Sequence, residues 1–221
     1  MNSLKEQYDQ MSQTFSESRK KHLWPELLAY LSRLKAGDRV LDMGAGSGRL
    51  FKGIPPDVEY IGLDISPGML KEAKRNQPHA TFFEADVLDN KSMNHLGQFD
   101  YVFVIALAHH LDEQELIKLF FSVKNKLSPN GIAILSCWRL FNKKYIKYHL
   151  RQFFKKIIKK NLRYVEIPFS ISNGKEAVRI IYRTCYAYDI IKLKALANQV
   201  GLKVITHSKS KANLWLECSL R

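Results

Sequence analysis

The chain has 221 residues, of which 46% are apolar and 25% are charged. These values predict one globular domain, or one domain with an insertion, and no run of ~18 apolar residues suggests a membrane span. The stretch from Met1 to Gln13 lacks the apolar region of a secretion signal, and the cysteines at positions 137, 185 and 218 are far apart. We therefore expect a reduced, cytoplasmic protein without a metal site.

The positive charge is concentrated in one part of the chain. Although the net charge is +14, residues 1–138 hold 16 Lys/Arg against 17 Asp/Glu, whereas residues 139–221 hold 19 against 4. This asymmetry indicates a polyanionic partner for the C-terminal third.

Apolar periodicity and capping residues predict the elements in chain order. Two helices (4–15 and 24–34) precede strands that alternate with helices. Strands are expected at 40–43, 60–63, 80–87, 101–107 and 132–138, and helices at 47–52, 67–76 and 113–127. Two strand-like pieces (165–171 and 178–182), a helix (190–200) and a hairpin (202–206 with 214–218) end the series. We predict an α/β fold with a mainly parallel sheet, a C-terminal antiparallel strand and helices on both faces.

This order also divides the expected single domain into parts. Residues 1–38 form N-terminal helices and 39–138 a cofactor-binding core. Residues 139–180 form a basic insertion, and 181–221 a final helix and strands.

A glycine bend follows the first strand of the core. Gly44, Gly46 and Gly48 are spaced G-x-G-x-G, and positions without side chains let a ligand touch the backbone. Asp64 follows at the tip of the second strand, where a carboxylate can accept hydrogen bonds from both hydroxyls of a ribose. The sequence therefore predicts a site for an adenosine-bearing cofactor.

Asp42 indicates which cofactor this is. It precedes the bend where a pyrophosphate would lie, and its carboxylate would repel phosphates but attract the ammonium group of S-adenosylmethionine. A dinucleotide, or an unrelated ligand on the same fold, is the alternative. Further cofactor contacts are expected at the strand ends, from Ala45, Ile65, Asp86, Val87 and Ala106. Of these, Asp86 with Val87 would read the adenine edge, unless Asp86 is only a loop or capping acid.

Four segments resemble a known family. They are Phe15–Arg19 with Trp24-Pro25, the glycine motif Val40–Gly48, the run Ala106–Leu111 with its pair His109-His110, and Arg183–Tyr188. Together they resemble the tRNA wobble-uridine carboxymethyl methyltransferases, which are class I S-adenosylmethionine-dependent enzymes. The Arg183 segment departs most from the family pattern, because Thr184 and Tyr186 stand where that family has Tyr and His.

This resemblance implies the Rossmann-like class I methyltransferase fold and methyl ester formation on tRNA. It also implies a small zinc-binding activator subunit as a partner. Arg19 and Arg183 would grip the substrate carboxylate, His110 and Tyr186 would orient it or the base, and Trp138 would stack on a flipped nucleobase. The alternatives are purely structural roles: surface salt bridges for the arginines, and core packing for His110 and Trp138.

Residues 139–163 contain ten Lys/Arg and no acid, with apolar residues at helical spacing. We expect one amphipathic basic helix over residues 143–160. It would bind tRNA phosphates, lie on an anionic membrane, or form a lid over the active site. Two other functions stay open: a small-molecule methyltransferase with a basic lid, and a non-catalytic RNA- or membrane-binding module on a methyltransferase scaffold.

Overall fold

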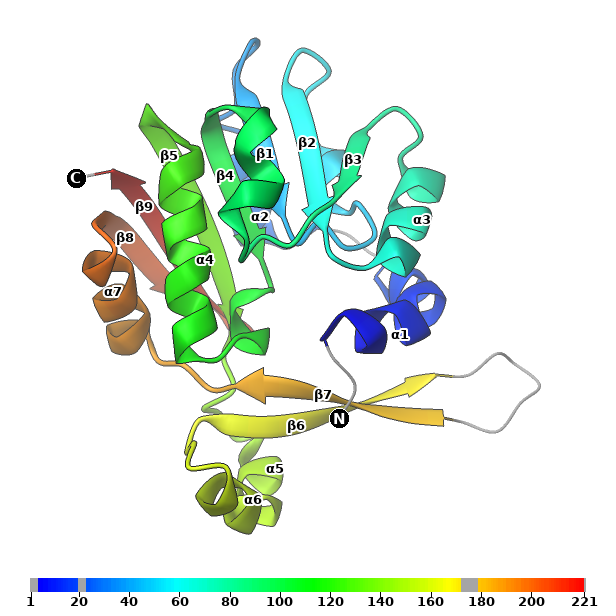
Figure 1. The fold of residues 1–221 in the computed structure, drawn as a ribbon, viewed down its shortest axis with the longest axis vertical. Coiled ribbons are helices and arrows are strands. Elements are labelled where there is room, and N and C mark those ends of the chain that lie inside the picture. The colour runs from blue at the N-terminus through cyan, green and yellow to red at the C-terminus, as the bar shows by residue number, and fades with distance from the viewer. Residues whose placement is uncertain (1–3, 20–22, 172–178, 221) are drawn as a thin grey trace.

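A seven-stranded sheet forms the centre of the molecule (Figure 1). The computed structural model describes residues 4–19, 23–171 and 179–220. The strands of the sheet are β1 (Arg39–Met43), β2 (Glu59–Asp64), β3 (Thr81–Glu84), β4 (Phe99–Ile105), β5 (Leu127–Trp138), β8 (Leu202–Lys209) and β9 (Asn213–Leu220).

The strand order is β3-β2-β1-β4-β5-β9-β8. β1 to β5 pair in parallel, whereas β9 pairs antiparallel with both β5 and β8. This is the mainly parallel sheet with a C-terminal antiparallel strand that the sequence predicts. The order reverses between β1 and β4, and a sheet of this kind binds ligands at the carboxyl ends of the strands beside such a reversal.

Helices cover both faces of the sheet. α4 (Glu113–Lys126) and α7 (Ile190–Gln199) pack on one face, where they share a core with Leu41 of β1. α2 (Pro25–Leu31) and α3 (Pro67–Asn76) bury residues in a second core that contains Val40. Adjacent residues of β1 thus point to opposite faces, as the two-residue period of a strand requires.

Capping residues fix where two of these helices begin. The side chain of Ser66 accepts a hydrogen bond from the Met69 amide at the start of α3, with Pro67 in the first turn. Asp112 and Glu115 form a reciprocal capping box at the start of α4. Such caps satisfy backbone amides that have no partner within the helix.

Several element boundaries differ from the prediction. β3 ends at Glu84, so Asp86 and Val87 lie in the loop that follows it. β5 begins at Leu127, and the predicted turn at residues 129–131 is a bulge inside it, because the pairing passes from Phe99↔Leu127 to Tyr101↔Ile132. Residues 50–53 form a 3₁₀ turn in place of the helix expected at 47–52, and α2 is shorter than predicted.

The chain between β5 and α7 forms a separate hairpin and a small lobe. β6 (Tyr164–Ile171) pairs antiparallel with β7 (Arg179–Tyr186), and this two-stranded sheet crosses below the main sheet in Figure 1. The strand-like piece expected at 178–182 is thus part of a longer strand, and its first residue lies outside the described residues. We call residues 139–163 the basic lobe.

The prediction of one long basic helix is wrong. The lobe holds two short helices, α5 (Ile146–Arg151) and α6 (Phe153–Ile158), which are separated at Gln152. The Gln152 side chain donates a hydrogen bond to the Glu166 carbonyl (2.9 Å) and accepts one from the Glu166 amide (2.7 Å). This side chain therefore ties the lobe to β6 at the point where the helix is interrupted. Across the described residues, every helix is too short or too polar to span a bilayer.

α1 (Leu4–Ser18) lies between α3 and β7, beside the carboxyl ends of the central strands (Figure 1). Asp9 fastens it, because its Oδ1 accepts hydrogen bonds from the Gly68 amide (2.9 Å) and the Ser66 hydroxyl (2.5 Å) at the start of α3. A second bond joins Gln10 to Arg179 of β7 (2.9 Å). α1 is thus held from two sides over the strand ends.

Candidate cofactor and acceptor site

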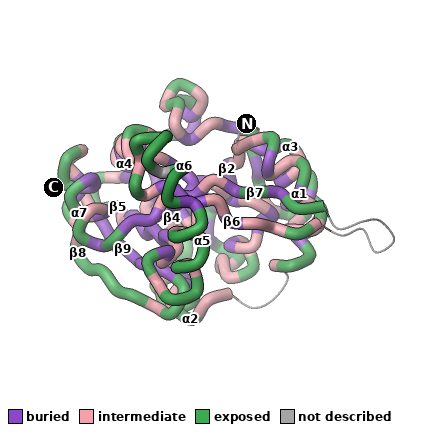
Figure 2. Tube along the Cα trace, turned by 90° about the horizontal axis from the view of Figure 1, so that it is seen from below, coloured by how far each residue is buried: buried purple, intermediate pink, exposed green. Residues whose placement is uncertain are grey.

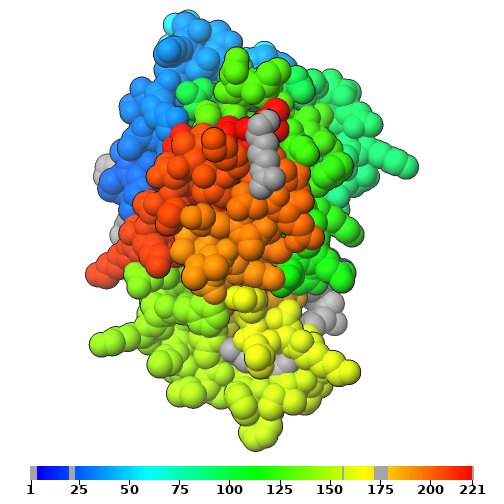
Figure 3. Space-filling view, turned by 90° about the vertical axis from the view of Figure 1, so that its left-hand side faces the viewer, coloured from blue at the N-terminus to red at the C-terminus, as the bar shows by residue number. Residues whose placement is uncertain are grey.

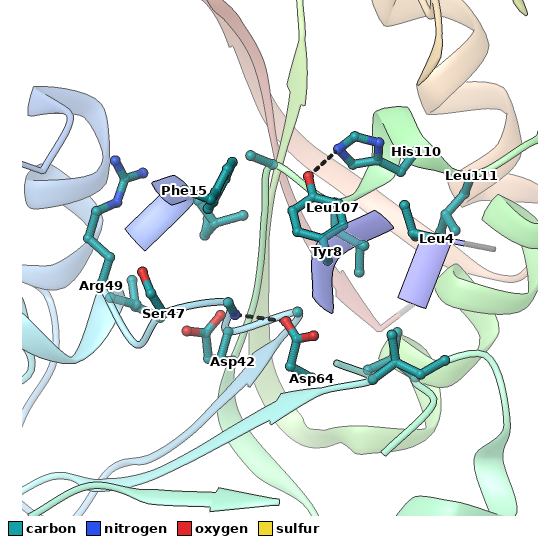
Figure 4. Close-up of a pocket in the computed structure, with 18 of the residues that line it drawn as sticks. Leu4, Tyr8, Phe15, Asp42, Ser47, Arg49, Asp64, Leu107, His110 and Leu111 are labelled. Atoms are coloured by element: carbon teal, nitrogen blue, oxygen red, sulfur yellow. Dashed lines mark hydrogen bonds between the residues drawn. The ribbon is translucent and has the colours of Figure 1, made fainter. Parts of the chain in front are cut away.

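A cavity of about 470 Å³ lies between the carboxyl ends of the central strands and α1 (Figure 4). Of the predicted site residues, eleven line it: Arg19, Asp42, Gly44, Ala45, Gly46, Asp64, Ile65, Asp86, Val87, Ala106 and His110. Three predicted residues do not line it, namely Gly48, Arg183 and Tyr186. The structure therefore gathers the strand-end residues at one site, as the parallel sheet requires.

The glycine bend brings its backbone close to the cavity. Gly44 and Gly46 have φ values of +80° and +56°, a conformation that residues with a side chain rarely adopt. A Cβ on Gly44 would lie 3.0 Å from Cδ2 of Leu107. Gly48 has φ +74° but faces away from the cavity, since a Cβ there would meet the ring of Phe82 at 2.9 Å. Gly48 therefore serves the packing of the bend rather than a ligand.

Asp64 is held in place by the bend itself. Its Oδ2 accepts a hydrogen bond from the Gly46 amide (2.8 Å) and its Oδ1 accepts one from the Ser66 amide (2.9 Å), and both side chain and bend face the cavity (Figure 4). Burial raises the pKa of Asp64 to about 6, and these backbone donors oppose that rise. The carboxylate is fixed with further lone pairs available to a ligand.

Asp42 is almost completely buried beside Asp64. Burial raises its pKa to about 7, although the Tyr60 hydroxyl, which donates a hydrogen bond to Oδ2 (2.9 Å), lowers it. The neighbouring charge of Asp64 raises it further. Two acids whose ionisation is opposed by burial favour a ligand that brings positive charge.

Two arginines lie at the end of the cavity beside the bend. The guanidinium of Arg49 lies 4.2 Å from the ring centroid of Trp24, and that of Arg19 lies 5.1 Å from the ring of Phe15. Burial lowers the pKa of Arg49 to about 10, so it stays charged at neutral pH. The sequence analysis missed Arg49, although its place directly after Gly48 was the available signal. A free carboxylate is the ligand group that suits this pair.

The remaining strand ends complete the cavity. Asp86 lies in the loop after β3, where its Oδ1 accepts a hydrogen bond from the Leu88 amide (2.9 Å). Ala106, directly after β4, has φ +58°, and its amide donates to the Ser136 hydroxyl (2.9 Å). A residue with a side chain in this conformation is strained, and such strain is concentrated at functional sites.

His110 forms a hydrogen-bonded chain with Tyr8 of α1. Its Nδ1 lies 3.0 Å from the Thr184 carbonyl, so Nδ1 donates, and Nε2 accepts from the Tyr8 hydroxyl at 2.8 Å (Figure 4). Burial lowers the pKa of His110 to about 4 and raises the pKa of Tyr8 to about 12. At neutral pH both are uncharged. The sequence analysis missed Tyr8, because its helical spacing suggested only packing.

Arg183 lies behind this pair, outside the cavity lining. The residue is 4% exposed, and its guanidinium carbon lies 4.9 Å from the ring centroid of Trp138 and 5.2 Å from that of Phe169. Within the described residues, its Nε and Nη1 have no hydrogen-bond partner. A buried cation with two unused donors is costly unless an anion or water reaches it.

Tyr186 and Trp138 are placed differently from the expectation. Tyr186 is the last residue of β7, where it packs against Tyr164 (ring centroids 6.1 Å apart) and the core, and it does not line the cavity. Trp138 lines the cavity, but the ring of His109 already stacks on it at 4.2 Å. Stacking of a nucleobase on Trp138 stays a prediction.

The comparisons with known proteins agree with this geometry. The family described as "Methyltransferase domain" matches residues 40–131, which run from β1 into β5 and include both acids and the glycine bend. Residues 40–131 of the chain thus match a methyltransferase domain. The predicted fold class and the predicted methyltransferase assignment are thereby confirmed.

Relatives of this methyltransferase domain include named tRNA enzymes. A tRNA (carboxymethyluridine(34)-5-O)-methyltransferase from Saccharomyces cerevisiae is 31% identical over 134 residues, which is 60% of this chain and 47% of that protein. The one from Schizosaccharomyces pombe is 25% identical and covers 95% of this chain and 92% of its own length. The chain thus spans less than half of the Saccharomyces relative.

Solved structures share the fold of the methyltransferase. The CcbJ methyltransferase from Streptomyces caelestis superposes with a TM-score of 0.75 at 14% identity, and the match covers 97% of each chain. An S-adenosylmethionine-dependent methyltransferase from Clostridium acetobutylicum gives a TM-score of 0.68 at 14% identity, covering 96% of this chain and 98% of that one.

One further cluster of the methyltransferase has metal-ligand chemistry, although the sequence predicts no metal site. Among the described residues, the donor atoms of His109, His110 and Cys185 lie within 4.8 Å of one another, and all three are buried. Burial lowers the pKa of both histidines, and the charge of Arg183 lowers it further. A bound cation would meet the same repulsion, and His110 Nδ1 is already engaged with Thr184.

Proposed function

We propose that this chain transfers a methyl group from S-adenosylmethionine to the carboxylate of a carboxymethylated wobble uridine in tRNA. The observation that carries the choice of acceptor is Arg183. Its buried guanidinium has two donors without partners and lies beside Trp138, which lines the cavity. An anionic acceptor entering the cavity would relieve this unsatisfied charge. The printed names of the Saccharomyces and Schizosaccharomyces relatives point to the same acceptor.

The cavity suits S-adenosylmethionine better than a dinucleotide. Asp64 is positioned for the ribose hydroxyls, and Asp42 faces the part of the bend where a pyrophosphate would need positive charge. The raised pKa values of both acids are relieved by a cationic ligand and worsened by an anionic one. Arg49 and Arg19 would hold the amino-acid carboxylate, and Asp86 with Val87 would border the adenine.

The proposed reaction requires little proton transfer by residues of the protein. S-adenosylmethionine supplies an electrophilic methyl group on a positively charged sulfur. A carboxylate acceptor is already deprotonated, so no general base is required, and the residues only need to align the acceptor oxygen with the methyl group. Positioning of this kind can be worth ~7 kcal/mol.

His110 has a positioning role and is not a general base. Its lowered pKa, about 4, makes it a weak base, and its Nε2 is occupied by the Tyr8 hydroxyl. It therefore fixes the position of Tyr8 at the cavity wall rather than removing a proton. Arg183 supplies the positive charge for the acceptor carboxylate.

The tRNA partner, the small zinc-binding activator subunit and the cytoplasmic location stay predictions. The activator would be needed if the purified chain alone were inactive or insoluble.

The decisive experiment is transfer of labelled methyl from S-adenosylmethionine to total cellular RNA, protein and small-molecule fractions. We expect label in tRNA, in a base-labile methyl ester of a wobble uridine. Asp64→Ala should abolish transfer without weakening tRNA binding. Label confined to small molecules would establish the metabolite methyltransferase instead, and absence of cofactor binding would establish the non-catalytic module.

A further inference from the structure

Exposed apolar side chains gather on the basic lobe. Of fifteen large hydrophobic residues that are exposed in the described part of the chain, eight lie between positions 141 and 162. They are Phe141, Ile146, Leu150, Phe153, Phe154, Ile157, Ile158 and Leu162. Phe154 and Ile158 are 77% and 80% exposed. An apolar concentration of this kind on a soluble surface marks a site that contacts a partner or a membrane.

These side chains are not the packing face of the lobe. Neither α5 nor α6 buries a residue among those described, and Gln152, between them, holds the lobe to β6. Tyr145 and Tyr148 supply the contact with the small core under the hairpin. Seen from below, most of the described residues of both helices are exposed, and the lobe projects from one end of the molecule (Figures 2 and 3).

The same surface is strongly positive. Residues 139–163 hold ten Lys/Arg and no acid. Within the described residues, ion pairs tie Lys155 to Glu166 (2.6 Å) and Arg163 to Asp189 (3.8 Å). Lys143, Lys144, Lys147, Arg151 and Lys160 make no ion pair there. The partner must therefore offer negative charge and apolar contact over the same small area.

We propose that the basic lobe docks on the surface of an anionic phospholipid bilayer. Phe154 and Ile158 enter the boundary between headgroups and acyl chains, and the flanking lysines contact the lipid phosphates. Interfacial helices combine apolar and basic side chains in this way. RNA would satisfy the lysines but not the aliphatic residues Ile146, Leu150 and Ile158, which have no aromatic face on which a base could stack.

Docking by this lobe leaves the cavity open. None of residues 139–163 lines the cavity, and the hairpin of β6 and β7 lies between the lobe and α1 (Figure 1). Within the described residues, no contact with the cavity therefore supports a role for this segment as a lid. Membrane docking is independent of the identity of the methyl acceptor, since it uses other residues.

The test is flotation of the full chain with vesicles of phosphatidylcholine alone and with vesicles that also contain phosphatidylserine. We expect flotation only with the second. Phe154→Ser combined with Ile158→Ser should lower partitioning about tenfold or more, because both exposed anchors are lost. Lys143→Gln combined with Lys147→Gln should lower it about fivefold for each lysine removed.

The matched control is Ile191→Ser on α7, which removes an apolar side chain of 77% exposure outside the lobe. It should float like the unchanged chain. Because all these positions are exposed, thermal unfolding and cofactor binding should be unchanged in every variant. The proposal is overturned if anionic vesicles do not bind the chain, or if the Ile191 and Phe154/Ile158 variants lose equal binding. It is also overturned if the lysine variant weakens the binding of tRNA and leaves the binding of vesicles unchanged. That result would make the lobe an RNA surface.

Discussion

The hydroxyl of Tyr8 lies 2.8 Å from Nε2 of His110, so a residue of α1 and a residue after β4 form one hydrogen-bonded pair at the cavity wall (Figure 4). The other ring nitrogen of His110 contacts the Thr184 carbonyl of β7 at 3.0 Å. Three segments that are distant in the sequence are therefore joined through one imidazole ring. The tautomer follows from this arrangement, because a carbonyl oxygen only accepts, so Nδ1 carries the proton and Nε2 accepts from Tyr8.

Tyr8→Phe should show how much this pair contributes. The substitution leaves Nε2 of a buried histidine without a donor, which costs about 1–3 kcal/mol of unfolding free energy. Methyl transfer should fall as well, because α1 and the segment after β4 are no longer joined by this hydrogen bond. The control is Tyr182→Phe, where the ring is 53% exposed and a loss near zero is expected in urea unfolding. Equal losses in both variants would argue against the pair.

Cofactor binding should depend on pH. The pKa of Asp42 is raised to about 7 and that of Asp64 to about 6, so both bind protons in the free protein as the pH falls below these values. A cationic ligand favours the ionised acids, so its binding releases protons, and affinity for S-adenosylmethionine should rise with pH and level off above about 7. Calorimetry at a series of pH values measures this.

Tyr60→Phe sharpens that measurement. The Tyr60 hydroxyl lowers the pKa of Asp42 through a hydrogen bond of 2.9 Å, so its removal should move the pH midpoint of binding upward. A midpoint that moves down, or affinity that is flat between about pH 5 and pH 8, would contradict the role given to Asp42.

Asp42→Asn should separate stability from function. A buried acid with a raised pKa contributes stability below its unfolded pKa, and this is lost as the pH rises through about 7. The neutral amide avoids that loss and can still accept the Tyr60 hydrogen bond. We expect the variant to be more stable than the original at alkaline pH, by on the order of 2 kcal/mol, while cofactor binding falls sharply. Thermal unfolding at acid and alkaline pH, together with calorimetry, would detect both effects.

Gly48→Ala should destabilise the fold without altering the cavity lining. Gly48 has φ +74°, and an added Cβ would lie 2.9 Å from the ring of Phe82, so backbone strain and a steric clash act together. Gly37→Ala is the matched control, because Gly37 has φ +86° and nothing within 4 Å of the added Cβ. The control should lose about 1–2 kcal/mol from strain alone, and Gly48→Ala should lose more in chemical denaturation.

Arg183→Met should lower acceptor binding more than it affects folding. The guanidinium is 4% exposed with two unpaired donors, and an apolar side chain of similar length avoids that burial cost. Unfolding free energy should therefore be unchanged or higher, whereas KM for tRNA rises and affinity for S-adenosylmethionine is retained. Arg151→Met in the basic lobe is the control, since Arg151 is exposed and makes no ion pair within the described residues. A stability loss of several kcal/mol in Arg183→Met would mean that the guanidinium is structural.

The cofactor half of the molecule could be predicted because its signals are local. Gly44 and Gly46, the two strand-end acids and the capping residue Ser66 depend on neighbours in sequence, and the structure places them as expected. Arg49 was within reach of the same reasoning, because it follows the bend directly.

The acceptor half could not be predicted in the same way. Tyr8, His110 and Arg183 come together only through the packing of α1 against β7, which no local pattern encodes. The basic segment misled because its helical spacing suggested one continuous helix. Gln152 divides it instead, through hydrogen bonds to Glu166 of β6 that depend on the tertiary fold.

The bond between Gln10 and Arg179 joins residues 169 positions apart, and it belongs to the contact that lays α1 against β7. During synthesis on the ribosome, α1 emerges long before the strand on which it rests. Until β7 has been made, α1 of a nascent chain is held over the strand ends from one side, by its hydrogen bonds to the start of α3. We therefore expect a chain shortened before β7 to release its nucleoside ligand more readily than the finished one.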